Sequence, residues 1–133
     1  MKRKLASMIA TVLCFATIIA CAACGPSKNR LQIAYENVYA QYPDAVACYE
    51  IGNDGSYLEV DTNPLDIDDY YNATYMSVLE AFQSELDVPD YVAQLMLTTT
   101  AMQGRQTETV NGLIISWTYH PDRGLEVLCR LES

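Results

Sequence analysis

The sequence predicts an α+β domain: an antiparallel sheet of about five strands with three helices packed on one face. Two observations support this fold class. Apolar residues recur at helical spacing in the segments 31–42, 68–86 and 87–104. The other segments alternate apolar and polar residues and are separated by turn-forming Asn, Asp and Gly, as in antiparallel hairpins. The expected order is therefore helix, hairpin, two helices and a meander.

The first helix is expected over 31–42, because Pro43 and Asp44 follow its last apolar position. Two strands, 45–51 and 56–61, then flank the turn Gly52-Asn53-Asp54-Gly55, whose residues tolerate positive φ.

The second helix is expected over about 68–86, with Asp66, Asp68 and Asp69 at its N-terminal end, where negative charge complements the helix dipole. Its apolar face is predicted to hold Tyr71, Tyr75, Val78, Leu79, Phe82 and Leu86. The third helix is expected to begin at the cap Asp87 and to end at Gly104. Its buried stripe is predicted to be Val88, Val92, Leu95, Thr99 and Met102.

The last third is expected to form a meander. Strand 106–110 meets the turn pair Asn111-Gly112, and a second turn over 120–124 returns the chain. The inward residues are predicted to be Leu113, Ile115, Trp117 and Tyr119, and then Leu125, Val127, Cys129 and Leu131. The segments 49–51 and 58–60 also resemble 117–119 and 125–127, which raises the hypothesis of a duplicated helix-plus-hairpin unit.

The N-terminus has the pattern of an export signal. Lys2, Arg3 and Lys4 precede an uncharged, mostly apolar run over 5–23, which ends in Ile18-Ile19-Ala20-Cys21. With an aliphatic residue at −3, a small residue at −1 and then Cys, this segment resembles a bacterial lipoprotein precursor. The resemblance covers only the first two dozen residues. It implies cleavage before Cys21, a diacylglycerol on the Cys21 sulfur and two or three acyl chains such as palmitate, enough for stable membrane anchoring.

Two alternatives remain open at this end. Ala22-Ala23-Cys24-Gly25 also has the form of a lipobox, which would make Cys24 the lipidated residue. The run is also long enough to be an uncleaved anchor. All three hypotheses place the chain on the extracytoplasmic face of the bacterial cell membrane. The expected organisation is a signal peptide over 1–20, a lipidated tether over 21–30 and one domain over 31–133.

The charge is unevenly distributed. The chain has eight Lys and Arg against 17 Asp and Glu, and from residue 31 onward only Arg105, Arg123 and Arg130 face all 17 acids. Nucleic acid is not expected as a partner, because counterion release needs clustered Lys and Arg. Such a domain favours basic, neutral or cation-bridged partners.

Asp61, Asn63, Asp66, Asp68 and Asp69 could supply oxygen ligands for Ca²⁺. Their spacing does not match an EF-hand loop, and the alternative is a solvated loop with helix-capping carboxylates. A Ca²⁺-stabilised envelope component therefore remains one hypothesis, although no metal or other cofactor is assigned from the pattern.

Cys48 and Cys129 both fall on expected strands. They could form a disulfide in an exported domain or remain two separate buried thiols. A thiol nucleophile is disfavoured, because the chain has a single His, His120, and it lies in an expected turn.

Tyrosine is abundant, with ten residues against two Phe. Most can pack in or beside the core, but Tyr39 and Tyr70 fall off the predicted buried stripes and are candidates for a partner surface. No catalytic motif is present. The sequence therefore favours a lipid-anchored, non-enzymatic module that binds a protein, peptide or glycan. The alternative is a small cell-surface hydrolase that uses an acidic pair or a cysteine.

Overall fold

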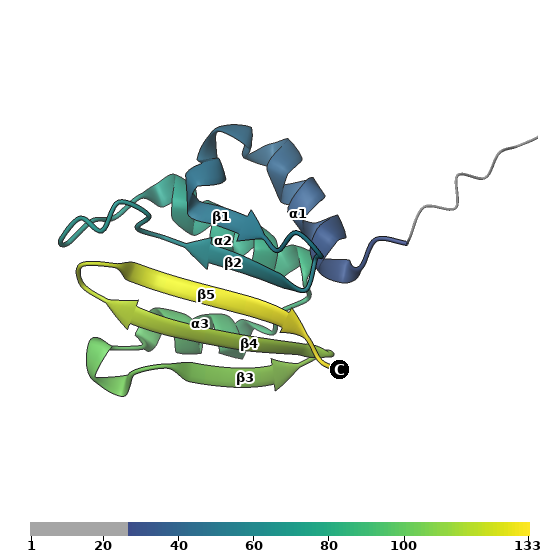
Figure 1. Ribbon diagram of the computed structural model, residues 1–133. Coiled ribbons are helices and arrows are strands. Elements are labelled where there is room, and N and C mark those ends of the chain that lie inside the picture. Colours follow the sequence, from purple (N-terminus) through teal and green to yellow (C-terminus); the bar gives the residue numbers. More distant parts are fainter. Residues whose placement is uncertain (1–26) are drawn as a thin grey trace, which may run out of the picture.

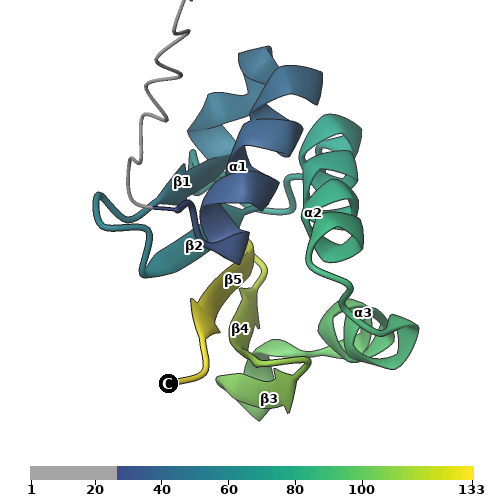
Figure 2. The ribbon, with the colours of Figure 1, turned by 90° about the vertical axis from the view of Figure 1, so that its right-hand side faces the viewer.

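In the computed structural model, which describes residues 27–133, one antiparallel five-stranded sheet is covered by helices on one face (Figures 1 and 2). The strands lie in the order β1-β2-β5-β4-β3. This confirms the α+β fold class expected from the sequence. The central contact is between β2 and β5, so the early hairpin and the late meander form a single sheet.

The strands are β1 (Tyr49–Ile51), β2 (Tyr57–Asp61), β3 (Gln106–Val110), β4 (Leu113–His120) and β5 (Gly124–Leu131). The main helices are α1 (Arg30–Gln41), α2 (Ala73–Glu85) and α3 (Asp90–Thr98), and the short 3-10 helices are η1 (Pro43–Cys48) and η2 (Ala101–Gln103).

Side chains on the helix-covered face of the sheet form the core. The alternation along β2, β4 and β5 buries every second residue against the helices, as a half-covered antiparallel sheet requires. The largest fully buried side chains of the sheet are Trp117, Leu58, Leu113 and Ile115. The opposite face, which we call the open face, carries no helix in the described part of the chain (Figure 2).

One end of the molecule is fixed by the start of α1. Asn29 caps the helix: its side chain accepts a hydrogen bond from the N–H of Gln32, and the Gln32 side chain accepts one from the Asn29 N–H. The Asn29 amide also donates to the Gly55 carbonyl, and the Arg30 guanidinium donates to the carbonyls of Asn111 and Leu86. Residues 29 and 30, expected in the tether, are therefore part of the folded domain.

The second helix differs from expectation at its start. It begins at Ala73 and not near Asp68, because the Asn72 side chain accepts hydrogen bonds from the N–H groups of Thr74 and Tyr75 and so caps the helix. The segment 62–72 is consequently a loop. Tyr71, expected to be buried in the helix, lies in this loop and is 74% exposed.

The third helix is shorter than expected at both ends. Its N-cap is Pro89, whereas Asp87 lies before the helix with a left-handed φ of 49°. The helix ends at Thr98, since Thr99 is already extended and Thr100 starts a capping box for η2. Leu95 and Met102, both expected to be buried, are exposed, and Met102 is 98% exposed.

Cys48 also differs from expectation. It ends the 3-10 helix η1 and does not lie on a strand, because β1 begins only at Tyr49.

The two hairpins have equivalent registers. Tyr49 pairs with Val60 in the first hairpin, as Trp117 pairs with Val127 in the second, and Val60 and Val127 face each other where the hairpins meet. The sequence similarity of the hairpins therefore corresponds to a local twofold relation in the sheet. It does not extend further, because η1 precedes β1 whereas strand β3 precedes β4.

The expected signal peptide, both candidate lipidation sites Cys21 and Cys24, and the apolar run 5–23 lie outside the described residues. Within 27–133, none of the helices has both the length and the apolar character needed to cross a bilayer.

Candidate functional site

A groove of about 500 Å³ lies at one end of the domain, between the loop 62–72, the end of α3 and the turn that joins β4 to β5. Asp69, Tyr70 and Tyr71 line it from the loop, Thr98–Thr100 from the end of α3, and Tyr119 from β4. We call it the tyrosine groove. Its volume is within the range of ligand-binding pockets in proteins.

Tyr119 forms part of the groove because of its place on β4. It follows Leu113, Ile115 and Trp117 on the helix-covered face of the sheet. Those three side chains are completely buried, whereas Tyr119 is 37% exposed. The same alternation that builds the core thus leaves one large aromatic side chain at the groove.

The wall formed by the end of α3 is fixed to the sheet. The indole N–H of Trp117 donates a 2.8 Å hydrogen bond to the Thr99 hydroxyl oxygen. The Thr99 hydroxyl in turn donates to the Leu95 carbonyl at 2.7 Å. Because the indole would otherwise be buried without a partner, this pair of bonds orders the last turn of α3.

The loop is fixed to the sheet by Asn63, which is completely buried. Its amide nitrogen donates to the carbonyls of Ile67 and Asp122, both at 2.8 Å, and its Oδ1 accepts a hydrogen bond from the Ile67 N–H. One side chain therefore closes the loop on itself and ties it to the β4–β5 turn.

A second link joins the same two segments. The N–H of Leu125 donates to the Thr62 hydroxyl at 2.9 Å, and the N–H of Thr62 donates to the Leu125 carbonyl at 3.0 Å. Gly124 packs directly against this link: a Cβ added to Gly124 would lie 2.7 Å from Thr62 Oγ1. The groove wall is thus a pre-ordered structure.

The residues proposed as calcium ligands do not form a ligand set. An Asp61 carboxylate oxygen accepts the Asn63 N–H, and the Asn63 amide is fully used in fixing the loop. Asp66 and Asp69 each adopt a left-handed φ near 50°, which serves the loop's turns. No three His, Cys, Asp or Glu side chains between residues 27 and 133 are grouped so that they could hold a metal ion. Asp68, the fifth candidate, belongs to no such group either.

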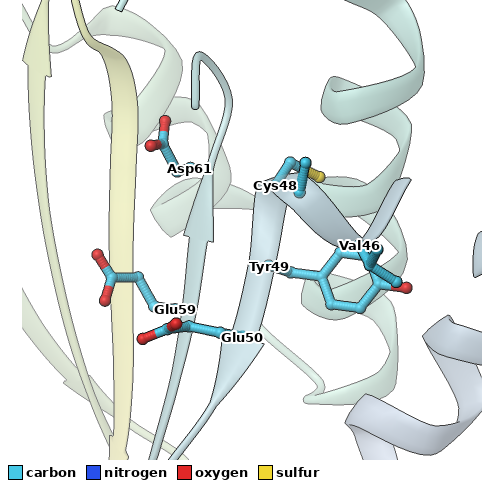
Figure 3. Close-up of a pocket in the computed structure, with 7 residues that line it drawn as sticks. Val46, Cys48, Tyr49, Glu50, Glu59 and Asp61 are labelled. Carbon is cyan, nitrogen blue, oxygen red and sulfur yellow. The ribbon is translucent and has the colours of Figure 1, made fainter. Parts of the chain in front are cut away.

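A second, smaller pocket of about 300 Å³ lies at the edge strand β1. Figure 3 shows the carboxylates of Glu50, Glu59 and Asp61 on one side of the strands, and the Tyr49 ring and the Cys48 thiol on the other. Glu50 and Glu59 are direct partners in the register of β1 and β2. Partial burial, together with neighbouring carboxylates that include Glu126, raises the pKa of Glu59 and of Asp61.

Neither cysteine of the domain is positioned for nucleophilic chemistry. Burial raises the pKa of Cys48 to about 11 and that of Cys129 to about 12, so both are neutral thiols at pH 7. Cys129 lies opposite Ile115 of β4, and His120 is five residues further along that strand, at the β4–β5 turn. The imidazole is therefore roughly 16 Å along the strand from Cys129, too far to act as its base.

The two cysteines are also not joined to each other. Both are free and buried. Tyr49, which follows Cys48, pairs with β2, and Cys129 pairs with β2 from its other side. An intervening strand separates the two cysteines by about 10 Å, beyond the 4.4–6.8 Å between Cα atoms that a disulfide needs.

The structure separates the two tyrosines proposed as a partner surface. Tyr39 lies on α1, where its ring stacks on that of Tyr35 with 6.3 Å between the ring centroids. The Tyr35 ring in turn makes an edge-to-face contact with the buried Tyr49. Tyr70 instead lines the tyrosine groove, and its hydroxyl accepts a hydrogen bond from Asn72. Sequence reasoning missed Tyr71 and Tyr119 because periodicity placed both on buried faces. The cap residue Asn72 was the available signal for Tyr71.

Comparison of the chain with protein-family models, with curated proteins and with solved structures found no match.

Proposed function

We propose that this protein is a lipid-anchored module on the outer face of the bacterial cell membrane, and that it binds a partner protein in the tyrosine groove without catalysing a reaction. The observation that carries this proposal is the groove itself, a pre-ordered surface of three tyrosines on a domain whose titratable groups have no catalytic arrangement. Tyrosine is enriched at protein interfaces because it combines a large apolar ring with a polar tip.

The placement of the groove supports this role. The described chain enters the domain at Asn29, beside the β1–β2 and β3–β4 turns, and the groove lies at the other end of the sheet, at the β4–β5 turn (Figure 1). A lipid attached N-terminal to Asn29 would therefore hold one end of the domain near the bilayer and leave the opposite end accessible.

The titratable groups favour binding over hydrolysis. Both thiols of the domain have raised pKa values and no His beside them. The carboxylate pair Glu50 and Glu59 lies on the open face, away from the tyrosine groove. An enzyme built on that pair would leave the groove without a role.

The binding role is tested by site-specific photo-crosslinking in the native cells. A photoreactive residue is introduced at Tyr71, at Tyr39 and, as a control, at Thr107, an exposed residue of β3. We expect a discrete protein adduct from position 71 and none from position 107. An adduct from position 39 alone would move the binding surface to α1, and the absence of adducts at all three positions would reject the proposal.

The anchoring is tested separately by Cys21→Ala, with Cys24→Ala as the matched variant. We expect Cys21→Ala to abolish the acyl-modified N-terminal peptide in mass spectrometry and to release the protein from the membrane fraction. Loss of the lipid in Cys24→Ala alone would assign the anchor to Cys24. Membrane retention with an unprocessed N-terminus in both variants would indicate an uncleaved anchor.

A further inference from the structure

We infer that the tyrosine groove takes a basic segment of the partner protein, one that places a Lys or Arg side chain next to an apolar residue. This inference rests on the proposed binding function and adds the chemistry of the occupant. The charges around the groove, the polar groups that remain free in it and its apolar surroundings all favour this occupant.

The groove has negative charge and no positive charge of its own. Asp69 is the one carboxylate that lines it. The same loop carries Asp66 and Asp68, and the adjoining turn carries Asp122. None of these four carboxylates forms an ion pair with a Lys or Arg within residues 27–133. Asp122 lies 3.7 Å from His120 Nδ1, which carries a positive charge only when it is protonated, so Asp66, Asp68 and Asp69 are the carboxylates of this end without an ionic partner among the described residues.

No Lys or Arg side chain lines the groove, and the basic residues of the described chain act on other carboxylates. Lys28 and Arg30 are at the opposite end, where they pair with Glu36 and Asp87. Arg123, although close in sequence to the groove, approaches Glu126 at 4.0 Å. Its positive charge also stabilises the ionised form of Asp61 and so opposes the rise in the pKa of that carboxyl. Arg105 acts on Glu59 in the same way, so both arginines interact with carboxylates of the open face.

Arg130 is the remaining basic residue. On β5 it lies opposite Tyr57 of β2, near the end of the sheet far from the groove. The groove therefore attracts a cation and offers an anion no basic partner.

The polar groups left free in the groove favour a hydrogen-bond donor. The hydroxyls of Thr98 and Thr99 donate to the carbonyls of Gln94 and Leu95, and that of Thr100 contacts the Gln103 side chain. Within residues 27–133, the Asp69 carboxylate and the phenol oxygens of Tyr71 and Tyr119 have no such partners. A carboxylate only accepts hydrogen bonds, and tyrosine rings attract ammonium and guanidinium groups.

The apolar surroundings extend beyond the groove. Leu97 of α3 lines the groove and is exposed, and Leu65 and Ile67 are exposed large apolar side chains of the loop that borders it. Exposed apolar side chains around a pocket are typical of a protein-binding surface. A small amine would occupy the groove but leave these side chains uncovered, whereas a peptide segment with neighbouring apolar residues would cover both.

The test uses the full chain in nanodiscs of neutral phosphatidylcholine and three seven-residue peptides, in which leucine alternates with arginine, glutamine or glutamate. Binding is measured by calorimetry and by the fluorescence of Trp117, the single tryptophan, whose indole bonds to Thr99 at the groove. We expect the arginine peptide to bind about tenfold more tightly than the glutamine peptide. We expect the glutamate peptide not to bind.

Three variants locate the effect. Asp69→Asn should weaken the arginine peptide about threefold to fivefold and leave the glutamine peptide unchanged. Glu132→Gln, an equal charge change at the exposed C-terminal end, should alter neither. Tyr71→Ala should weaken both peptides, and Tyr71→Phe should restore most of the arginine binding, because the ring is retained and only the phenol oxygen is lost.

Each contrary outcome has a definite meaning. If the glutamine peptide binds as tightly as the arginine peptide and Tyr71→Ala weakens both, the groove binds protein but the inference of a basic segment is wrong. If Glu132→Gln weakens the arginine peptide as much as Asp69→Asn does, the attraction is a general effect of net charge and the inference is also wrong. If none of the peptides binds, the inference fails, and the crosslinks from position 71 then decide separately whether the groove binds a protein.

Discussion

At the scale of single residues, a few small or polar side chains determine the shape of the groove. Asn63 uses its whole amide group to connect the loop 62–72 to the β4–β5 turn. Gly124 allows the two segments to approach, since it has a left-handed φ of 70° and a Cβ there would collide with Thr62. Asn63 is completely buried and Gly124 lines the groove with backbone alone, yet the position of Tyr70 and Tyr71 depends on both.

The role of Gly124 is tested by replacing it with alanine. Gly124→Ala forces an alanine into the left-handed region of φ and places its Cβ 2.7 Å from Thr62 Oγ1. The free energy of unfolding should therefore fall by about 2–4 kcal/mol. Gly112→Ala is the matched control, because Gly112 also has a positive φ but has no atom within 4 Å of its Cβ position.

Gly112→Ala should cost only about 1–2 kcal/mol in urea unfolding. Equal costs for the two variants would show that the close approach at Gly124 has no energetic weight.

At the scale of secondary-structure elements, the ends of the helices decide what is exposed. The periodicity of apolar residues continues through 68–72, but the Asn72 cap starts α2 at Ala73 and releases Tyr71 into the loop. In the same way, α3 ends at Thr98, where Thr99 turns to accept the indole N–H of Trp117. The loop and the end of α3 then provide two walls of the groove.

The ordering of the loop gives a second prediction. Asn63→Ala, at a completely buried position, leaves the Ile67 N–H without its acceptor and the carbonyls of Ile67 and Asp122 without their donor. The variant should be about 2–3 kcal/mol less stable. Hydrogen exchange of the loop amides should also become faster, because the loop loses its connection to the β4–β5 turn.

Asn53→Ala, in the exposed β1–β2 turn, is the control and should change neither quantity by a measurable amount. Unchanged exchange in the loop of Asn63→Ala would mean that Thr62 and Leu125 alone hold the loop in place.

At the scale of the whole molecule, eight of the 17 acidic residues form two groups on different parts of the surface. One group surrounds the tyrosine groove, and the other, formed by Glu50, Glu59, Asp61 and Glu126, lies on the open face of the sheet. The second group is crowded, since Glu59 lies opposite Glu50 and Asp61 lies opposite Glu126. Like charges that face each other across strands are destabilising when ionised.

This crowding gives a pH-dependent stability. The pKa values of Glu59 and Asp61 are raised in the folded state by partial burial and by the neighbouring carboxylates. Arg105 opposes the rise at Glu59, and the hydrogen bond from the Asn63 N–H and then Arg123 oppose it at Asp61. A group with a raised folded pKa stabilises the fold when protonated, and that contribution is lost as the pH rises through the folded pKa. The melting temperature should therefore rise as the pH is lowered from 7 to 5, toward the raised pKa values of Glu59 and Asp61.

The double variant Glu59→Gln/Asp61→Asn should be more stable than the parent at pH 7 and should show a smaller increase at pH 5. Scanning calorimetry of both chains measures these differences. Asp54, whose pKa is lowered by its hydrogen bonds to Ser56, has the opposite dependence, so Asp54→Asn should leave the increase intact. A double variant with the same pH dependence as the parent would contradict this account.

The sequence by itself determined the fold class, the meander and the uneven charge, because alternation, turn pairs such as Asn111-Gly112 and residue counts are local properties of the chain. It also named Tyr70, but it assigned Tyr71 and Tyr119 to buried faces. Periodicity specifies which side of a helix or strand is apolar. It does not specify where the helices that cover the sheet begin and end. Only the tertiary structure decided the tyrosine groove, because its walls meet through contacts such as Thr62 with Leu125, which are 63 positions apart in the sequence.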